Sequence, residues 1–215
     1  MKRAIAWFFL AAFSAAGVVP ATADPVQFKL LSNYSRATFK TDAPLETIVG
    51  NSVAGGLGGT LTVDLAKPQS AVGSVRIDMS TVKTGIDKRD ADMQDPQFLD
   101  VGASEANKFV TFEVKSVEIA GALEPGKAVP ARVSGILTIK QKPVSVVAEA
   151  LVTWVKLGPE HVEAQRRFGF TPDNIKVRAK LATTFTNHGM QVPQLLFLKV
   201  SNEIQLEADL TFVRQ

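Results

Sequence analysis

Apolar and polar residues alternate with a period of two through much of this chain. The alternation is cleanest from 204 to 212, where one set of positions is apolar and the intervening set is polar. The segments 59–65 and 75–79 repeat the pattern. Because successive side chains of a β-strand point to opposite faces, this alternation predicts strands with one buried face and one wet face.

The remaining strand-like segments are separated by residues typical of turns, such as Gly55-Gly56, Lys67-Pro68 and Glu124-Pro125-Gly126. About nine short strands with turns between them favour an all-β, antiparallel fold. A sandwich and a closed barrel both fit this pattern, because each has one inner and one outer face. The further predicted strands lie at 26–32, 35–40, 109–119, 130–140, 144–156 and 175–186.

The predicted strand at 144–156 is apolar on nearly both faces. A one-sided strand would need polar residues on its outer face, so we expect a second layer to cover this strand. The segment 193–198 is apolar but lacks the strand alternation. It is a candidate either for that cover or for the mouth of a barrel.

One charged segment interrupts the strands and predicts a short helix from Asp87 to Phe98. Thr84 or Asp87 would be its N-cap, and the Asp95-Pro96 pair marks its end. The segment lacks a continuous apolar stripe, so we expect it to pack through a few residues as a cap across one barrel end. Those residues are Ile86, Met93, Phe98 and Leu99.

The first residues have the pattern of a cleaved export signal. Lys2 and Arg3 precede an apolar run that ends near Val19, and Ala21-Thr22-Ala23 follows. The run is shorter than the roughly 20 residues that a membrane span needs, so we expect a signal at 1–23 and no stable membrane anchor. The remaining residues, 24–215, suit one domain. The chain has no cysteine, which excludes disulfides and a lipid-modified cysteine.

The charge balance argues against a nucleic-acid partner. The 24 basic residues include Lys2 and Arg3, so 22 remain against 21 acidic residues once the predicted signal is removed. Basic residues are scattered singly and form no block. We therefore expect no nucleic-acid binding.

Residues with catalytic or metal-binding chemistry are few. The only histidines, His161 and His188, are expected to be solvated, and no spacing suggests a metal site. No Gly-x-Ser-x-Gly elbow follows the predicted signal. Asp87, Asp90 and Asp92 are read as solvated capping and ion-pairing residues. We predict no catalytic residue, metal or cofactor, and we interpret the glycines at 55–59 as a flexible turn or bulge at a rim.

Two separated motifs carry a resemblance to a known family. The first is Thr84–Met93 followed by Phe98–Val101, and the second is Ser134–Ile139 followed by Lys142-Pro143-Val144. Together they resemble the signature of the YceI-like, polyisoprenoid-binding periplasmic proteins, although Asp92 stands where the family usually has histidine. The run Asp42–Gly50 is similar to a subgroup with an Ala-Pro-Leu-Glu-Thr-Ile sequence.

This resemblance implies a lipocalin-like extended barrel in the periplasm, with a lipid chain in the lumen and no enzymatic activity. The implied ligand is a polyisoprenoid, a quinone or another amphiphilic lipid, bound for carriage, storage or stress response. Tyr34 or Arg89 would meet its head group. The predicted wall residues are Phe39, Leu61, Val63, Val75, Ile77, Phe112, Val114, Leu137, Ile139, Val152, Trp154, Leu206 and Leu210.

Two alternatives remain at this point. One is a barrel with a filled interior that serves a structural or partner-binding role. The other is an enzyme that acts on an isoprenoid or a hydroperoxide. The sequence leaves the oligomeric state open, a homodimer included.

Overall fold

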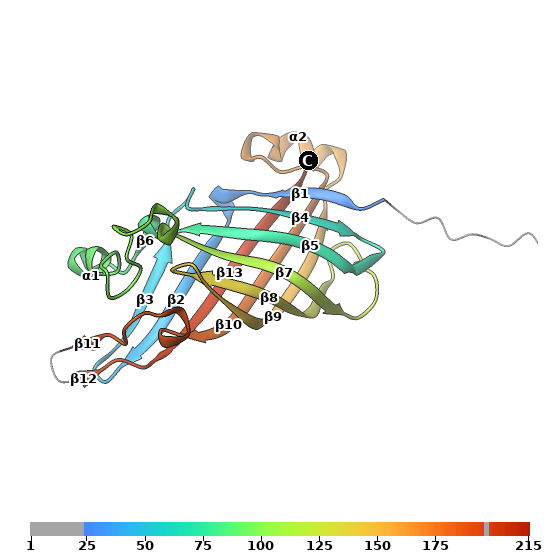
Figure 1. Ribbon diagram of the computed structural model, residues 1–215. Helices are drawn as coiled ribbons and strands as arrows, with labels where there is room; N and C mark the ends of the chain where they lie inside the picture. Colours follow the sequence, from blue (N-terminus) through green and yellow to red (C-terminus); the bar gives the residue numbers. More distant parts are fainter. Residues whose placement is uncertain (1–23, 196–197) are drawn as a thin grey trace, which may run out of the picture.

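A closed barrel of eight antiparallel strands forms the body of the protein (Figure 1). The structure is a computed structural model that describes residues 24–195 and 198–215. The barrel confirms the all-β fold class and decides between the sandwich and the barrel. Its strands, in order around the ring, are β1 (Val26–Leu30), β4 (Leu57–Asp64), β5 (Lys67–Asp78), β7 (Phe109–Ile119), β8 (Ala128–Ile139), β9 (Lys142–Lys156), β10 (Asp173–Thr184) and β13 (Glu203–Arg214), and β13 pairs with β1 to close it.

Shorter strands extend the barrel at one end. One edge of β13 pairs with β1 near residues 212–214 and with β2 near residues 205–209, so β1 and β2 share that edge. The hairpin of β2 and β3 therefore continues the wall beyond β1, on the left in Figure 1. These extending strands are β2 (Arg36–Ala43), β3 (Glu46–Ser52) and β6 (Val82–Lys83), with β11 (Gln194–Leu195) and β12 (Leu198–Lys199) as a separate small hairpin.

The predicted helix is present but shorter than expected. Helix α1 spans Asp87–Asp92 and does not reach Phe98. Residues 93–101 form turns instead, consistent with the bias against helix in the residue before Pro96. The N-cap is Ile86, so the prediction of Thr84 or Asp87 in that position was wrong.

A second helix, α2 (Pro159–Gln165), lies in a polar segment for which the sequence analysis predicted no helix. Pro159 at the first helical position is favourable because its missing N–H would have no partner there. None of the helices in the described part of the chain is long and apolar enough to cross a membrane. Single 3-10 turns complete the structure at η1 (Ser32–Tyr34), η2 (Met79–Thr81), η3 (Glu105–Lys108), η4 (Arg166–Phe168) and η5 (Thr186–His188).

A row of alanines crosses four neighbouring strands of the barrel and the adjoining strand β2. Strand register pairs Ala131 of β8 with Ala150 of β9, and Ala150 with Ala179 of β10. The row continues from Ala179 to Ala208 of β13 and from Ala208 to Ala37 of β2. Large residues at these inward positions would fill the barrel. The alanines leave space at its middle.

The outer face of β9 is not covered as predicted. Val147 is 45% exposed, so no second layer lies over this residue, whereas Leu151 and Val155 on the same face are half-buried. Of the segment 193–198, residues 196 and 197 lie outside the described residues, and Pro193 and Gln194 line the interior cavity. Pro193 and Gln194 therefore contribute to the cavity rather than to a cover over the outer face of β9.

Candidate ligand-binding cavity

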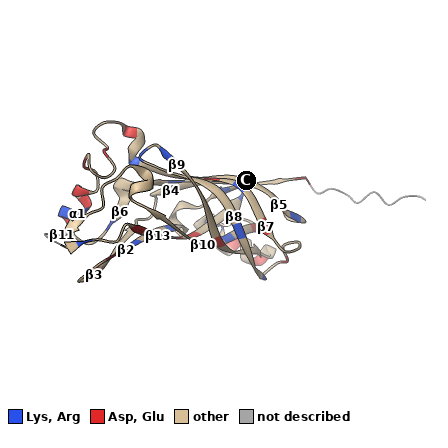
Figure 2. Ribbon diagram, turned by 60° about the horizontal axis from the view of Figure 1, so that its bottom comes forward, with Lys and Arg blue, Asp and Glu red and all other residues tan. Residues whose placement is uncertain are grey.

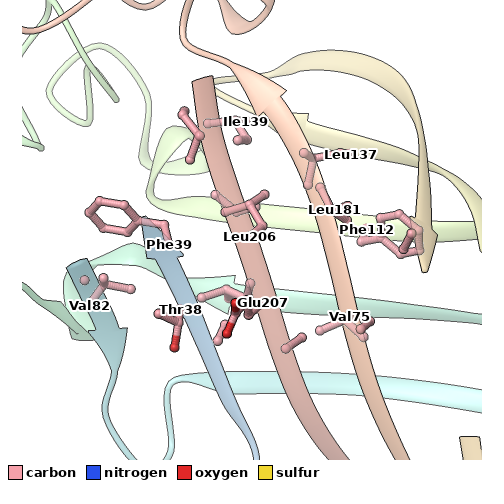
Figure 3. Close-up of a pocket in the computed structure, with 18 of the residues that line it drawn as sticks. Thr38, Phe39, Val75, Val82, Phe112, Leu137, Ile139, Leu181, Leu206 and Glu207 are labelled. Carbon is pink, nitrogen blue, oxygen red and sulfur yellow. The ribbon is translucent and has the colours of Figure 1, made fainter. Parts of the chain in front are cut away.

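The barrel encloses one large apolar cavity with a volume of about 960 Å³ (Figure 3). A volume of this size lies near the upper end of the range for small-molecule sites. Along β13 its lining runs from Ile204 to Phe212, a length of roughly 27 Å at about 3.4 Å per residue. The cavity is therefore long and suited to an extended chain.

The predicted wall residues lie along this cavity, with the exception of Trp154. In Figure 3, Phe39, Phe112 and Leu206 approach the same space from three different strands. Their contact with a ligand stays a prediction. The predicted residues that line the cavity are Phe39, Leu61, Val63, Val75, Ile77, Phe112, Val114, Leu137, Ile139, Val152, Leu206 and Leu210.

Trp154 lies beyond the cavity, at the end of the barrel opposite α1. Its indole N–H donates to Asp173 at 3.1 Å, and its ring packs against a buried cluster that includes Leu123. The alternation correctly gives Trp154 the same facing as Val152, but it does not show where along the strand the lumen ends. Trp154 therefore belongs to the packed end rather than to the wall.

The end around Trp154 is closed by packing and hydrogen bonds. Leu123 is 5% exposed and its backbone N–H donates to the carbonyl oxygen of Leu65 at 3.1 Å. The Gln69 side chain donates to the carbonyl oxygen of Ile119 at 3.0 Å. Phe28, Ile175 and Phe212 fill the neighbouring interior with almost no exposure. These contacts pack the interior tightly around Trp154.

Tyr34 lies outside the cavity, so the structure does not support a head-group role for it. Its ring is 43% exposed and packs against Phe170, with the ring centroids 4.8 Å apart, and edge-on against Phe168 at 6.5 Å. Tyr34 belongs to η1, on the outer surface between β1 and β2. Arg89, the other predicted head-group residue, does line the cavity.

The α1 end of the cavity is polar. Figure 2 shows acidic and basic residues side by side on α1. Arg89 of α1 donates to both carboxylate oxygens of Glu46 on β3, at 2.9 and 3.2 Å. Lys88 pairs with Asp92 at 2.9 Å, one helical turn further along. All four of these side chains line the cavity.

Asp90 fixes α1 to the barrel and is not solvated as predicted. The residue is 8% exposed, and its carboxylate accepts hydrogen bonds from the Thr84 backbone N–H at 2.8 Å and the Thr84 hydroxyl at 2.7 Å. Burial raises the pKa of the Asp90 carboxyl, but these bonds and the positive charges of Lys83 and Arg89 hold that pKa below its ordinary value. Asp90 thus holds the loop before α1 in place.

The segment 190–194 forms another part of the polar end. A place at the mouth was predicted only for 193–198, which overlaps this segment at Pro193 and Gln194. Gln191 donates its backbone N–H to the carbonyl oxygen of Gln97 at 2.8 Å, which joins this segment to the turns after α1. Gln97, Gln191 and Gln194 all line the cavity. Sequence reasoning also missed Glu46 as a lining residue, although it lies in the Ala-Pro-Leu-Glu-Thr-Ile run.

His188 is buried, which contradicts the prediction that it is solvated. It lies in the expected turn, η5, but its ring has 0% exposure. Nε2 lies 2.8 Å from the Thr183 hydroxyl and Nδ1 lies 3.0 Å from the carbonyl oxygen of Lys142. Burial lowers the pKa of His188. His188 therefore joins β10 to the start of β9 as a neutral ring.

His161 is exposed as predicted, beside Glu160 on α2. Among the described residues no group of three or more His, Asp or Glu side chains is placed to hold a metal ion. The glycines at 55–59 form a turn and the start of β4, and Gly55 adopts a positive φ of 89° that suits glycine.

The comparisons with known proteins identify the family. The family model described as "YceI-like domain" matches residues 28–212, which is most of the chain. The chain belongs to the YceI-like family. No curated protein sequence matches it. The resemblance carried by the α1 segment and by Ser134–Ile139 is therefore confirmed.

Solved structures of low sequence identity share the fold of this YceI-like chain. Burkholderia cenocepacia BcnA has a TM-score of 0.61 at 17% identity, covering 82% of this chain and 95% of its own. A polyisoprenoid binding domain from Saccharophagus degradans, implicated in plant cell wall breakdown, has a TM-score of 0.63 at 14% identity, covering 88% and 99%. The Campylobacter jejuni YceI protein has a TM-score of 0.58 at 16% identity, covering 79% and 86%.

Proposed function

We propose that this protein is a non-catalytic binding protein that holds a polyisoprenoid or a similar amphiphilic lipid in its barrel. The observation that carries the proposal is the long apolar cavity of about 960 Å³. Each buried methylene contributes roughly 0.8 kcal/mol, so a long chain can bind by burial alone with few polar contacts. Family membership and the binding named for the Saccharophagus degradans domain support the same ligand class.

The alanine row supports an open interior over a filled one. Ala179 and Ala208 line the cavity from neighbouring strands, at a level where larger side chains would occupy it. The alternative of a barrel with a filled interior does not agree with this cavity. The proposed location is the periplasm, on the basis of the signal pattern at 1–23, which lies outside the described residues. Carriage, storage or a stress response are the proposed roles there.

The first experiment is to express the full chain, recover it from the periplasmic fraction and record its native mass spectrum. Organic extraction should then release an isoprenoid or related lipid that mass spectrometry identifies. A lipid recovered chemically unchanged after incubation supports binding, whereas conversion to a product would favour the enzyme alternative. A mass without bound lipid, together with no uptake of added isoprenoids, would overturn the proposal.

A matched pair of variants tests whether the lipid lies in the cavity. Ala179→Phe places a large ring among the alanines, and we expect it to abolish lipid retention. Ala182→Phe is the control, because Ala182 is exposed on the outer face of the same strand. Thermal melting of both variants checks that they fold. Equal lipid retention in the two variants would place the lipid elsewhere.

A further inference from the structure

The charged side chains that line the cavity are already paired with one another or with neighbours. Two cations line it in the described part of the chain, Arg89 and Lys88. Arg89 is engaged by both oxygens of Glu46, and Lys88 by both oxygens of Asp92, at 2.9 and 3.0 Å. Glu207 (Figure 3) is one further carboxylate that lines the cavity, and it pairs with Lys40 at 3.0 Å and with Lys180 at 3.4 Å.

The Arg89–Glu46 pair is the more protected of the two pairs at the polar end. The side chains of Arg89 and Glu46 are 24% and 38% exposed, whereas that of Lys88 is 83% exposed. Both hydrogen bonds come from Nη2 of Arg89, and charge-assisted bonds of this kind are stronger than those between neutral groups. An anionic head group that approached Arg89 would meet a guanidinium whose charge Glu46 already neutralises, and it would lie close to the Glu46 carboxylate, which has the same sign of charge.

Neutral polar groups are available at the same end. Gln97, Gln191 and Gln194 line it with exposed side chains, and an amide can both donate and accept hydrogen bonds. An uncharged head group, such as a hydroxyl or a quinone carbonyl, can use these amides without breaking an ion pair. We infer that the cavity selects amphiphiles with an uncharged head group over those ending in phosphate or carboxylate, and that Glu46 sets this preference by neutralising the charge of Arg89.

This inference rests on the proposed function, and the experiment separates the two. The delipidated full chain is loaded with the neutral fluorescent compound N-phenyl-1-naphthylamine, which is displaced by geranylgeraniol or by geranylgeranyl monophosphate. The two competitors share one chain and differ only in the head group. We expect the wild-type protein to bind the alcohol at least about tenfold more tightly, which corresponds to ~1.4 kcal/mol.

The variant Glu46→Gln removes the carboxylate and leaves Arg89 available to an anion. We expect the preference for the alcohol to fall by about tenfold or to reverse, chiefly through tighter binding of the phosphate. Glu149→Gln is the matched control, since it removes one negative charge from the outer surface, where Glu149 pairs with Arg132 at 3.2 Å. The control should keep the wild-type ratio, and melting curves should show that all three proteins fold.

Each outcome has a defined meaning. Tight phosphate binding by the wild-type protein, or an unchanged ratio in Glu46→Gln, would overturn the inference and leave the proposed function intact. The same shift in Glu149→Gln as in Glu46→Gln would also overturn it, because net charge would then explain the effect. Failure of the wild-type protein to bind the fluorescent compound and both competitors would overturn the proposed function, and the head-group preference with it.

Discussion

The ring of Phe39 on β2 lies directly over Gly50, its cross-strand partner on β3. A Cβ atom built on Gly50 would lie 2.1 Å from Phe39 Cε1 and 2.7 Å from its Cζ, well inside van der Waals contact. Phe39 therefore occupies space that exists only because residue 50 lacks a side chain. Since both residues line the cavity, this pair helps to set the width of its polar end.

We expect Gly50→Ala to push the Phe39 ring out of this position and to reduce lipid binding. Overpacking of this kind typically costs about 1–3 kcal/mol of stability. The double variant Gly50→Ala with Phe39→Leu should recover most of both losses, because the smaller side chain removes the clash. Urea unfolding and lipid retention of the single and double variants form a double-mutant cycle. Additive losses in the double variant would show that the two residues are not coupled.

The sequence predicted the wall better than it predicted the ends. Period-two alternation assigns the facing of Val63, Val75 and Leu206, because this period follows directly from strand geometry. It carries no information on register, so the alignment of Ala150, Ala179 and Ala208 could not be foreseen. Whether a barrel is open depends on that alignment.

The polar end depends on contacts between residues distant in sequence. Arg89 and Glu46 lie 43 positions apart, and their pairing follows from how α1 sits against β3. Asp90 was misjudged as solvated because charged residues are usually exposed, and the Thr84 hydrogen bonds that allow its burial are not visible in spacing alone. Trp154 was assigned to the cavity wall because alternation shows which face of a strand a residue occupies. It does not show where along the strand the cavity ends.

Removal of the Asp90 carboxylate should loosen α1. In Asp90→Ala the backbone N–H and hydroxyl of Thr84 lose their acceptor, and we expect a loss of about 1.5–3 kcal/mol at pH 7, as for hydrogen bonds to a charged group. Asp87→Ala, at an exposed position of the same helix, should change stability by less than about 0.5 kcal/mol. Urea unfolding at pH 7 measures both. Equal effects of the two substitutions would argue against the anchoring role of Asp90.

The Asp90 contribution should also depend on pH. Its pKa is lowered in the folded protein, so the contribution is complete above the ordinary value of 3.8 and is lost as pH falls through the lower folded pKa. The stability difference between the wild-type protein and Asp90→Ala should therefore shrink when unfolding is measured toward pH 3. A difference that stays constant to that pH would show that the charge on Asp90 is not what stabilises the loop.

His188 should make folding sensitive to mild acid. Its folded pKa is lowered, so the unfolded chain takes up a proton below about pH 6.5 before the folded protein does. Stability should be constant above that pH and should fall as pH decreases from about 6.5 toward 5. His188→Gln should flatten this slope, while His161→Gln, at an exposed position, should keep it. Urea midpoints at several pH values test this, and an unchanged slope in His188→Gln would refute it.

The close contact of β4 and β5 should tolerate no side chain at Gly73. A Cβ atom there would lie 2.4 Å from the carbonyl oxygen of Thr60, and backbone cannot move aside as a flexible side chain can. We expect Gly73→Ala to destabilise the barrel by about 1–3 kcal/mol, since relief of the clash requires the strands to separate. Gly58→Ala is the control, because a Cβ atom on Gly58 meets nothing within 4 Å. The control should remain near wild-type stability in urea unfolding. If both variants were equally stable, close packing of these two strands would not be what requires glycine at position 73.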